Sequence, residues 1–290
     1  MSAPKTLGFI GLGQMGQPIA ANIANGPAPL LCYDLVAGRA PEGATEVVSM
    51  AEVVAGAETT FLSLIDGAVV NSVATEIAAM GGVAGKVVVD MSTIGPNAAK
   101  EAAATLAAVG VTYIDAPVSG GRQGALKASI AIIWGGPKAE MDRHREIIDL
   151  FCANAFHVGE EPGQGQAVKL LNNFLTATSM SASTEAVLFG LHHGVDMKTI
   201  LDVVKVSTGN NTAISDKFPN RILPRTFDAG FFAELMNKDV QLYRRYVEEA
   251  GTPGQIGAQV ADVWQQVDDA LPRQSDFTRI FEVLEKRKKK

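Results

Sequence analysis

Short apolar runs alternate with alanine-rich segments through the first half of the chain. The runs have the length of strands and contain few polar positions; they cover residues 6–11, 30–35, 59–65, 86–92, 111–115 and 128–136. Apolar runs without polar alternation are typical of strands buried on both faces of a parallel sheet. Because the segments between them have helical composition, the pattern predicts right-handed βαβ units and a doubly wound sheet.

The pattern changes after the Gly- and Pro-containing segment 159–165, which follows a helix expected over 138–151. Residues 167–194 have the length of a helix and are apolar or small on most faces. That composition is typical of a helix buried on several sides, between two domains or two subunits. No strand-like run follows, and the later amphipathic helices are expected over 197–207, 233–251 and 255–271.

The two halves together predict the fold class and the domains. We expect an α/β protein in which a Rossmann-like, doubly wound dinucleotide-binding domain covers residues 1–162. An all-α C-terminal domain, for substrate binding and oligomerisation, is expected over residues 163–290.

Charge and cysteine content narrow the class of protein further. The 290 residues carry a net charge of −6, which argues against nucleic acid or an anionic membrane as partner. No run approaches the ~18 uninterrupted apolar residues of a membrane span, and the N-terminus lacks the order of a signal peptide. Cys32 and Cys152 form no metal-ligand or C-x-x-C pattern, which favours a reducing compartment. We therefore expect a cytoplasmic protein whose basic run, 286–290, is a solvated tail.

A glycine-rich turn follows the first predicted strand. Gly11, Gly13 and Gly16 form G-x-G-x-x-G between a strand and a helix. In dinucleotide-binding domains the first glycine permits a tight turn and the second lets the backbone approach a pyrophosphate, while the third lets helix and strand pack closely. The helix N-terminus then offers its amides to the phosphates. Gln14 and Met15, within the turn, are expected to contact the same cofactor.

Asp34 ends the second predicted strand, roughly 20 residues beyond the turn, where such domains place a ribose-binding carboxylate. A carboxylate there accepts hydrogen bonds from ribose hydroxyls and repels a 2′-phosphate, so NAD is the predicted cofactor. Arg39 lies five positions further on and leaves NADP open. The alternative is that Asp34 is only a polar residue at the end of a strand.

Two more predicted strands end in candidate cofactor contacts. Leu64 lies near the end of the third strand, and Thr93 lies in the segment 90–96, which ends the fourth. Ligands of doubly wound folds bind at this carboxyl edge of the sheet. A second interpretation of the segment, compatible with the first, is a turn that caps the following alanine-rich helix.

Lys169 and Asn173 are four residues apart, so on a helix they share one face. A lysine at a helix start can extend its amine to solvent. The functional alternative is a lysine in a cleft that gives a proton to a carbonyl oxygen as hydride reaches carbon, since partial desolvation lowers the pKa of an ammonium toward the working range. Asn173 then orients the lysine or binds the substrate oxygen.

Ser119, Gly120 and Gly121 follow the fifth predicted strand. Consecutive glycine amides with a hydroxyl make a cradle that suits a carboxylate, although the same residues also form ordinary turns. Arg122 and Lys127 add positive charge nearby, which favours an acidic substrate unless both are simply surface residues.

These segments in this order resemble the β-hydroxyacid dehydrogenase family, which includes 3-hydroxyisobutyrate dehydrogenase and tartronate semialdehyde reductase. The resemblance covers nearly the whole chain and rests on FIGLGQMGQPIAANI, DMSTIGP, DAPVSGGRQGA, GQGQAVKLLNN and MNKDVQL. It implies a Rossmann-like domain, a helical domain that closes over the cleft, and a homodimer or homotetramer.

The resemblance also implies roles for individual residues. Lys169 matches the catalytic lysine and Asn173 its partner amide, while 119–121 match the loop that binds the substrate carboxylate. Thr93 and Lys238 match positions near the nicotinamide, and Asp239 is expected to pair with Lys238. The implied reaction is reversible hydride transfer between NAD(P) and a small β-hydroxy acid, giving a semialdehyde or oxo acid.

Three departures bear on function. Residues 127–129 read KAS where the family often has Gly-Thr or Gly-Ser, and the segment 207–222 gives no substrate. Asn172 stands where decarboxylating relatives carry histidine, which argues against decarboxylation of a sugar acid.

Imine-reducing relatives usually lack the lysine, so an imine reductase is an alternative function that the presence of Lys169 disfavours. A nucleotide-binding protein without turnover is the other alternative.

His192 and His193 are the one candidate metal pair. Adjacent helical residues point about 100° apart and do not easily share one ion. With no clustered carboxylate or thiol nearby, no metal is expected, and a role at a helix end beside Gly194 is preferred.

Overall fold

The computed structural model describes residues 5–287. The start of the segment that argued against a signal peptide and the last three residues of the basic tail therefore lie outside the described residues. The chain forms two compact units, Met1–Lys169 and Leu170–Lys290. The expected domain boundary at 162/163 falls a few residues before this division, and it remains a prediction.

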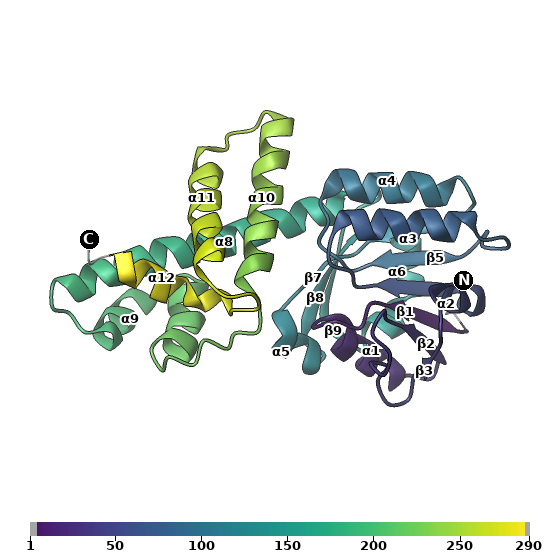
Figure 1. Cartoon of the computed structure of the whole chain (residues 1–290), viewed down its shortest axis with the longest axis horizontal. Coiled ribbons are helices and arrows are strands. Elements are labelled where there is room, and N and C mark those ends of the chain that lie inside the picture. The colour runs from purple at the N-terminus through teal and green to yellow at the C-terminus, as the bar shows by residue number, and fades with distance from the viewer. Residues whose placement is uncertain (1–4, 288–290) are drawn as a thin grey trace. The chain divides into compact units, whose positions relative to one another are not determined.

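A twisted sheet with helices on both faces makes up the first unit (Figure 1). Its strands within the described residues are β1 (Leu7–Ile10), β2 (Leu30–Tyr33), β3 (Thr45–Glu46), β4 (Thr59–Leu62), β5 (Val87–Asp90), β6 (Thr112–Asp115), β7 (Val118–Ser119), β8 (Ile130–Gly135) and β9 (Cys152–Gly159). Their order is β3-β2-β1-β4-β5-β6-β8-β7, with β9 beside β8. From β3 to β6 all neighbours are parallel, whereas β8 runs antiparallel to β6 and β7.

This order confirms the predicted doubly wound, Rossmann-type fold. The chain winds outward in both directions from β1 and β4, which are hydrogen-bonded neighbours. In such sheets the point where the winding reverses opens a crevice at the carboxyl ends of the strands, where ligands bind. The glycine turn after β1 and Leu64 after β4 therefore flank that point.

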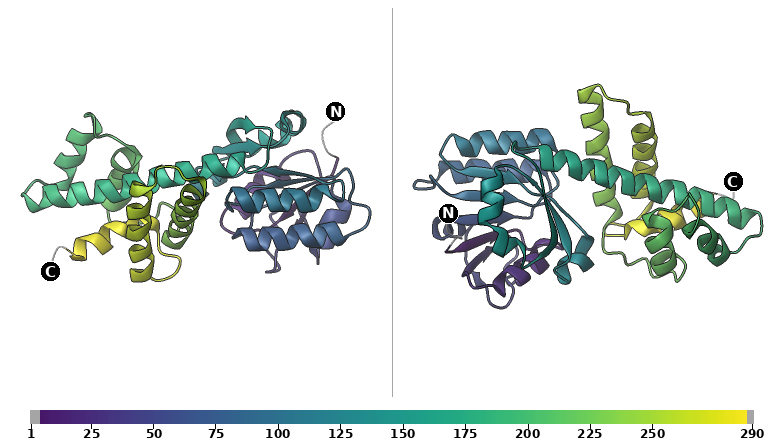
Figure 2. Two further views of the ribbon diagram at one scale, coloured as in Figure 1. Left: turned by 90° about the horizontal axis from the view of Figure 1, so that it is seen from above. Right: turned by 180° about the vertical axis from the view of Figure 1, so that it is seen from behind.

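Alternation of side chains along the strands builds one core on each face of the sheet. Phe9 and Phe61 point to one face, where they pack with α1 (Gly16–Ala24), α5 (Gly121–Leu126), α6 (Lys138–Arg143) and α7 (Arg145–Ile148). Ile10 and Leu62 point to the other, which is covered by α2 (Met50–Gly56), α3 (Gly67–Ala79) and α4 (Pro96–Ala107). Figures 1 and 2 show α3 and α4 side by side on this second face.

The helix expected over 138–151 is interrupted at His144, which separates α6 from α7. The His144 ring is fully buried, with Nε2 2.8 Å from Thr59 Oγ1 and Nδ1 2.7 Å from the Glu140 carbonyl. Burial lowers the pKa of His144, because desolvation disfavours the charged ring. The strand β9 was not predicted, because most of its residues are partly or fully exposed and it carries no continuous apolar run.

The second unit is helical, as predicted. It contains most of α8 (Gln164–His192), followed by α9 (Met197–Lys205), the π-helix η1 (Ala213–Ile222), α10 (Ala233–Ala250), α11 (Gln255–Ala270), the short 3-10 helix η2 (Phe277–Arg279) and α12 (Ile280–Arg287). Helices α10 and α11 lie side by side (Figure 1). Trp264, fully buried, donates from Nε1 to the Ala177 carbonyl at 3.3 Å and so joins α11 to α8. The uninterpreted segment 207–222 contains η1.

Two further features concern membrane crossing and the cysteines. In the described part, no helix combines the length and apolar character that crossing a bilayer requires. Cys32 and Cys152 are free and buried. Burial raises the pKa of the Cys32 thiol to about 12, so the thiol stays protonated and unreactive.

Candidate functional site

The glycine turn has the geometry of a phosphate cradle. Gly11 has φ +94°, and a side chain there would collide with the Ser63 carbonyl. A Cβ on Gly16 would lie 1.9 Å from the Gly11 carbonyl oxygen, so only glycine lets α1 start this close to the strand. At Gly13, by contrast, a Cβ would meet nothing within 4 Å. The backbone beside Gly13 therefore borders open space, as approach of a pyrophosphate requires.

Gln14 is exposed and Met15 half-buried at the start of α1. Met15 is the N-cap residue, and no side chain caps the helix there. The first-turn amides of a helix have no partner within the helix, and the positive end of its dipole favours an anion. The N-cap side chain therefore does not occupy the start of α1, which suits an anion.

Asp34 lies directly after β2 and is tied to the glycine turn. Its Oδ2 accepts a 2.7 Å hydrogen bond from the Leu12 amide, and its Oδ1 accepts one of 2.8 Å from the Val36 amide. Arg39 Nη1 lies 3.3 Å from Oδ1 in an ion pair. The carboxylate is thus held beside the turn by two backbone donors, with a cation at its outer edge.

The loops after β4 and β5 are joined by one hydroxyl. Leu64, half-buried, donates its amide to Ser92 Oγ at 2.8 Å, and the Ser92 amide donates to Asp90 Oδ1 at 2.9 Å. Thr93 follows at once and is half-buried. Gly95, rather than Thr93, is the N-cap of α4, so Thr93 does not cap that helix.

The loop at 119–121 leads from β7 into the short helix α5. Ser119 and Gly121 are half-buried and Gly120 is exposed. Gly120 is the N-cap of α5, and as a glycine it has no side chain to cap the helix. Arg122 is half-buried and Lys127 exposed. The loop therefore offers a hydroxyl, backbone amides and nearby positive charge together.

Lys169 lies in the second turn of α8 and is 8% exposed, so it is not the solvent-extended lysine of the first interpretation. It belongs to the first unit, with the glycine turn, Thr93 and Ser119. Lysines are rarely buried to this degree unless their charge is paired.

Asn173, one turn later in α8, belongs to the second unit and is held by α10. Its Nδ2 donates to Asp239 Oδ2 at 2.6 Å, while its Oδ1 accepts from Asn172 Nδ2 at 3.2 Å. Lys238 Nζ lies 3.3 Å from Asp239 Oδ1, which is the expected ion pair, although this contact lacks hydrogen-bond geometry. The rings of Phe174 and Tyr243 stack at 4.2 Å alongside. One buried carboxylate thus connects Asn173 and Lys238.

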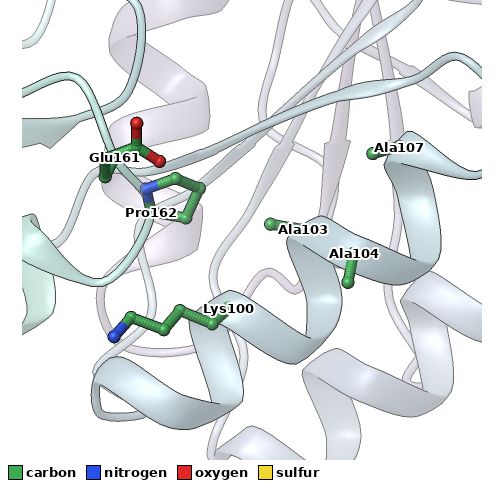
Figure 3. A pocket seen from close by; sticks show the side chains of 6 residues that line it. All are labelled: Lys100, Ala103, Ala104, Ala107, Glu161 and Pro162. Atoms are coloured by element: carbon green, nitrogen blue, oxygen red, sulfur yellow. The ribbon is translucent and has the colours of Figure 1, made fainter.

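Two candidates outside these groups carry no chemistry of this kind. A hollow of about 510 Å³ on the first unit lies where Glu161 and Pro162 face α4 (Figure 3). Its other lining residues are Lys100, Ala103, Ala104 and Ala107, so it contains none of the predicted site residues. The rings of His192 and His193 lie 5.3 Å apart at the end of α8. Within residues 5–287 no three His, Cys, Asp or Glu side chains gather to hold a metal ion.

Three buried polar residues beneath the site were not predicted from the sequence. Asp115, Gln166 and Asp90 are all fully buried at the carboxyl edge of the sheet or against it. The signal for Asp115 and Gln166 was present, since both lie inside the quoted segments DAPVSGGRQGA and GQGQAVKLLNN. Nothing in the sequence indicates that these two segments are hydrogen-bonded to each other.

Protein-family models match both halves of the chain. The model described as the NAD-binding domain of 6-phosphogluconate dehydrogenase matches residues 6–159. The model described as NAD-binding of NADP-dependent 3-hydroxyisobutyrate dehydrogenase matches residues 163–284.

Individual proteins are similar over nearly their whole length. The chain is 34% identical to the 3-hydroxyisobutyrate dehydrogenase of Pseudomonas aeruginosa, covering 90% of this chain and 93% of that protein. It is 31% identical to the 2-(hydroxymethyl)glutarate dehydrogenase of Eubacterium barkeri, covering 89% and 88% respectively. A structure of the Mycobacterium tuberculosis 3-hydroxyisobutyrate dehydrogenase with L-serine has a TM-score of 0.90 at 29% identity, covering 98% of this chain and 99% of that one.

Proposed function

The chain belongs to the β-hydroxyacid dehydrogenase family and is an NAD(P)-dependent dehydrogenase acting on hydroxyl groups, and we propose that it reversibly oxidises a small β-hydroxy acid. The product is the semialdehyde or oxo acid, and 3-hydroxyisobutyrate is the model substrate. The named relatives act on short hydroxy acids of this kind. The bound nicotinamide supplies the hydride acceptor in oxidation and the hydride donor in reduction.

One observation carries the proposal. Lys169 is buried in the second turn of α8, three residues after Gln166, whose side chain bonds the Ser92–Gly95 loop at the carboxyl end of β5. Lys169 therefore lies in the unit that carries the glycine turn. It is also close in the chain to Gln166, which is fixed at the ligand-binding edge of the sheet. Lys169 Nζ takes the hydroxyl proton in oxidation and returns it in reduction.

The residues of the glycine turn fit the cofactor. The open space beside Gly13 and the uncapped start of α1 suit a pyrophosphate, and Asp34 suits the ribose hydroxyls. Leu64 and Thr93 follow β4 and β5 at the same edge, and with Lys238 they are assigned to the nicotinamide end. NAD is preferred over NADP because Asp34 repels a 2′-phosphate. Arg39 already forms an ion pair with that carboxylate, so it does not offer a free cation to the phosphate.

The substrate carboxylate is assigned to Ser119 with the Gly120 and Gly121 amides. These groups give hydrogen-bond donors without a fixed negative charge, and Arg122 is half-buried beside them. Binding the carboxylate fixes the reacting carbon relative to the cofactor, which is how orientation lowers the barrier. The identity of the hydroxy acid depends on residues outside this set.

Asn173 is proposed to orient Lys169 from one helical turn away. Asp239 accepts from the Asn173 amide nitrogen at 2.6 Å, and an ionised carboxylate only accepts hydrogen bonds. The amide is therefore fixed with its carbonyl oxygen turned away from Asp239, where it accepts hydrogen bonds from donors such as an ammonium.

We also propose a cytoplasmic homodimer or homotetramer. Leu171, Leu175 and Phe189 are 44, 57 and 68% exposed on α8, and their spacing places them on one face of the helix. Exposed apolar stripes of this kind mark interaction surfaces, and a second copy is the partner that the resemblance implies. The buried, free thiols of Cys32 and Cys152 favour a reducing compartment.

A substrate panel tests the proposed function. The purified protein is assayed with NAD and NADP against 3-hydroxyisobutyrate, 3-hydroxypropionate, serine, glycerate and 4-hydroxybutyrate, and against matched alcohols without the carboxylate. We expect turnover with NAD of at least one hydroxy acid and none of its matched alcohol. Reduction of cyclic imines alone would instead indicate an imine reductase, and cofactor binding without any turnover would indicate a non-catalytic protein.

A further inference from the structure

Asp115 ends β6 and accepts hydrogen bonds from the start of α8. Its Oδ1 accepts from the Gly163 amide at 2.9 Å, and its Oδ2 accepts from the Gln166 amide at 2.7 Å. The side chain is fully buried. A carboxylate that spans two amides of a first helical turn fixes both the position and the direction of that helix.

Gln166 makes a second connection, from α8 to the loop after β5. Its Oε1 accepts from the Ile94 amide at 2.9 Å and the Gly95 amide at 3.1 Å, and its Nε2 donates to the Ser92 carbonyl at 3.0 Å. This one buried side chain therefore bonds the backbone on both sides of Thr93.

The start of α8 packs closely against the sheet. A Cβ at Gly165 would lie 2.7 Å from the carbonyl oxygens of both Asp115 and Ile133. The backbone of α8 thus sits directly against the ends of β6 and β8, as only glycine permits. The three hydrogen bonds of the Gln166 side chain, the two that Asp115 accepts and this contact all hold residues 163–166, within six residues of Lys169.

We propose that Asp115 and Gln166 are positioning residues, which together fix Lys169 relative to the Thr93 loop. The inference rests on the proposed role of Lys169, and it assigns to these two residues a part in the reaction without contact with the reacting atoms. Gln166 and Lys169 are three residues apart and so share one side of the helix. Fixing the Gln166 side chain on the Ser92–Gly95 backbone therefore fixes the orientation of the side of α8 that carries Lys169.

Two titratable side chains, Asp90 and Tyr113, lie near Asp115. Asp90 is its partner in the β5–β6 register, and Tyr113 Oη donates to Asp90 Oδ2 at 2.7 Å. Burial raises the pKa of Tyr113 well above its usual value, with a further contribution from Asp90, so the phenol stays protonated at neutral pH. Tyr113 therefore contributes no charge to the surroundings of Asp115.

A double-mutant cycle tests the inference. Gln166→Met keeps the bulk of the side chain and removes all three of its hydrogen bonds; it is combined with Lys169→Ala. Because a displacement of about 1 Å can cost roughly 100-fold in rate, we expect Gln166→Met alone to lower kcat by about 10-fold or more. In the Lys169→Ala background it should lower kcat no further, since a residue acting through the lysine has nothing left to position.

Thr59→Val is the matched control. Thr59 is fully buried and bonds one buried side chain, but it lies at the opposite end of β4 from the ligand-binding edge. We expect it to lower the melting temperature as Gln166→Met does while leaving kcat unchanged. The pH profile of kcat/KM gives a second readout, because displacing Lys169 shifts the apparent pKa of the proton-transfer step in Gln166→Met and not in Thr59→Val.

The outcomes separate the inference from the proposed function. If Lys169→Ala retains full turnover, the role of the lysine is wrong and the inference falls with it. If Lys169→Ala is impaired but Gln166→Met matches Thr59→Val in kcat and pH profile, only the positioning role is overturned. Equal fold-losses from Gln166→Met with and without Lys169 would overturn it as well. Asp115→Asn, which removes one acceptor oxygen, gives an independent second variant if Gln166→Met does not fold.

Discussion

Asn173 donates a 2.6 Å hydrogen bond to Asp239, which joins the two helices α8 and α10 through a buried amide and a buried carboxylate. The other oxygen of Asp239 lies 3.3 Å from Lys238. Two residues expected near the reacting groups therefore depend on one carboxylate, so a change at Asp239 affects both of them.

Replacing Asp239 with asparagine tests this dependence. The variant has a neutral amide with one acceptor oxygen in place of a carboxylate with two. It therefore lacks the charge beside Lys238, and the Asn173 amide is free to turn. We expect kcat to fall by about 10- to 100-fold, the usual cost of a small misplacement of catalytic groups. Steady-state kinetics of Asp239→Asn and Asn173→Ala would check it, with Asp262→Asn, an exposed ion-pair residue on α11, as control. Unchanged kcat in both test variants would contradict the account.

Asp34 is the residue proposed to select NAD over NADP. Asp34→Ala removes the ribose acceptor and releases Arg39 from its ion pair. We expect the dissociation constant for NAD to rise by roughly 10- to 100-fold, the range for losing hydrogen bonds to a charged group, and discrimination against NADP to fall. Titration of each dinucleotide by fluorescence would measure both effects. Equal preference for the two cofactors in the unchanged protein would show that Asp34 does not select NAD.

Ser119 is expected to act on the substrate rather than on the cofactor. Ser119→Ala removes one donor to the carboxylate, so KM for the hydroxy acid should rise by about 10-fold. The dissociation constant for NAD should stay the same, because Ser119 is not assigned to the dinucleotide. A parallel rise in both constants would place Ser119 at the cofactor instead.

Asp115 should make stability depend on pH. Burial raises its pKa to about 7 from an ordinary value of 3.8, despite the opposing hydrogen bonds from Gly163 and Gln166 and with added repulsion from Asp90. The folded protein holds this proton more tightly than the unfolded chain, so the contribution to stability is present at low pH. It is lost as pH rises from about 4 to about 7.

The comparison with Asp115→Asn isolates this contribution. Relative to the variant, the unchanged protein should lose on the order of 4 kcal/mol of unfolding free energy across that window, at about 1.4 kcal/mol per pH unit. Urea denaturation at several pH values measures the difference, in which the contributions of other groups cancel. A difference that does not change with pH would mean that Asp115 has an ordinary pKa.

Local signals predicted the fold, and they supplied the candidate site residues, which remain predictions. The continuous apolar runs predicted the strands β1, β2, β4, β5, β6 and β8, and the glycine spacing placed the turn at Gly11–Gly16 after β1. The strand β9 escaped prediction, because it lies at one side of β8 and its residues show no apolar run. The break at His144 was also missed, since it depends on a partner, Thr59, that is 85 residues away in the chain.

The roles of the buried residues Asp115 and Gln166 could not be predicted from the sequence, because they also depend on partners distant in the chain. Asp115 and Gln166 each look like ordinary polar residues beside glycine-rich motifs. Their roles arise from hydrogen bonds across 51 and 74 residues of sequence, to the Gln166 amide and the Ser92 carbonyl. Periodicity identifies which face of a helix is apolar, but it does not identify the distant backbone groups that a buried amide satisfies.

Lys169→Ala is the most direct test of the mechanism. The kcat for oxidation of the best hydroxy acid is measured beside the dissociation constant for NAD, which confirms that the variant folds and binds cofactor. We expect kcat to fall by roughly 100-fold or more, the range for loss of a positioned proton-transfer group, with cofactor affinity retained. Turnover within about twofold of the unchanged protein, a difference of under 0.5 kcal/mol, would contradict the central role given to Lys169.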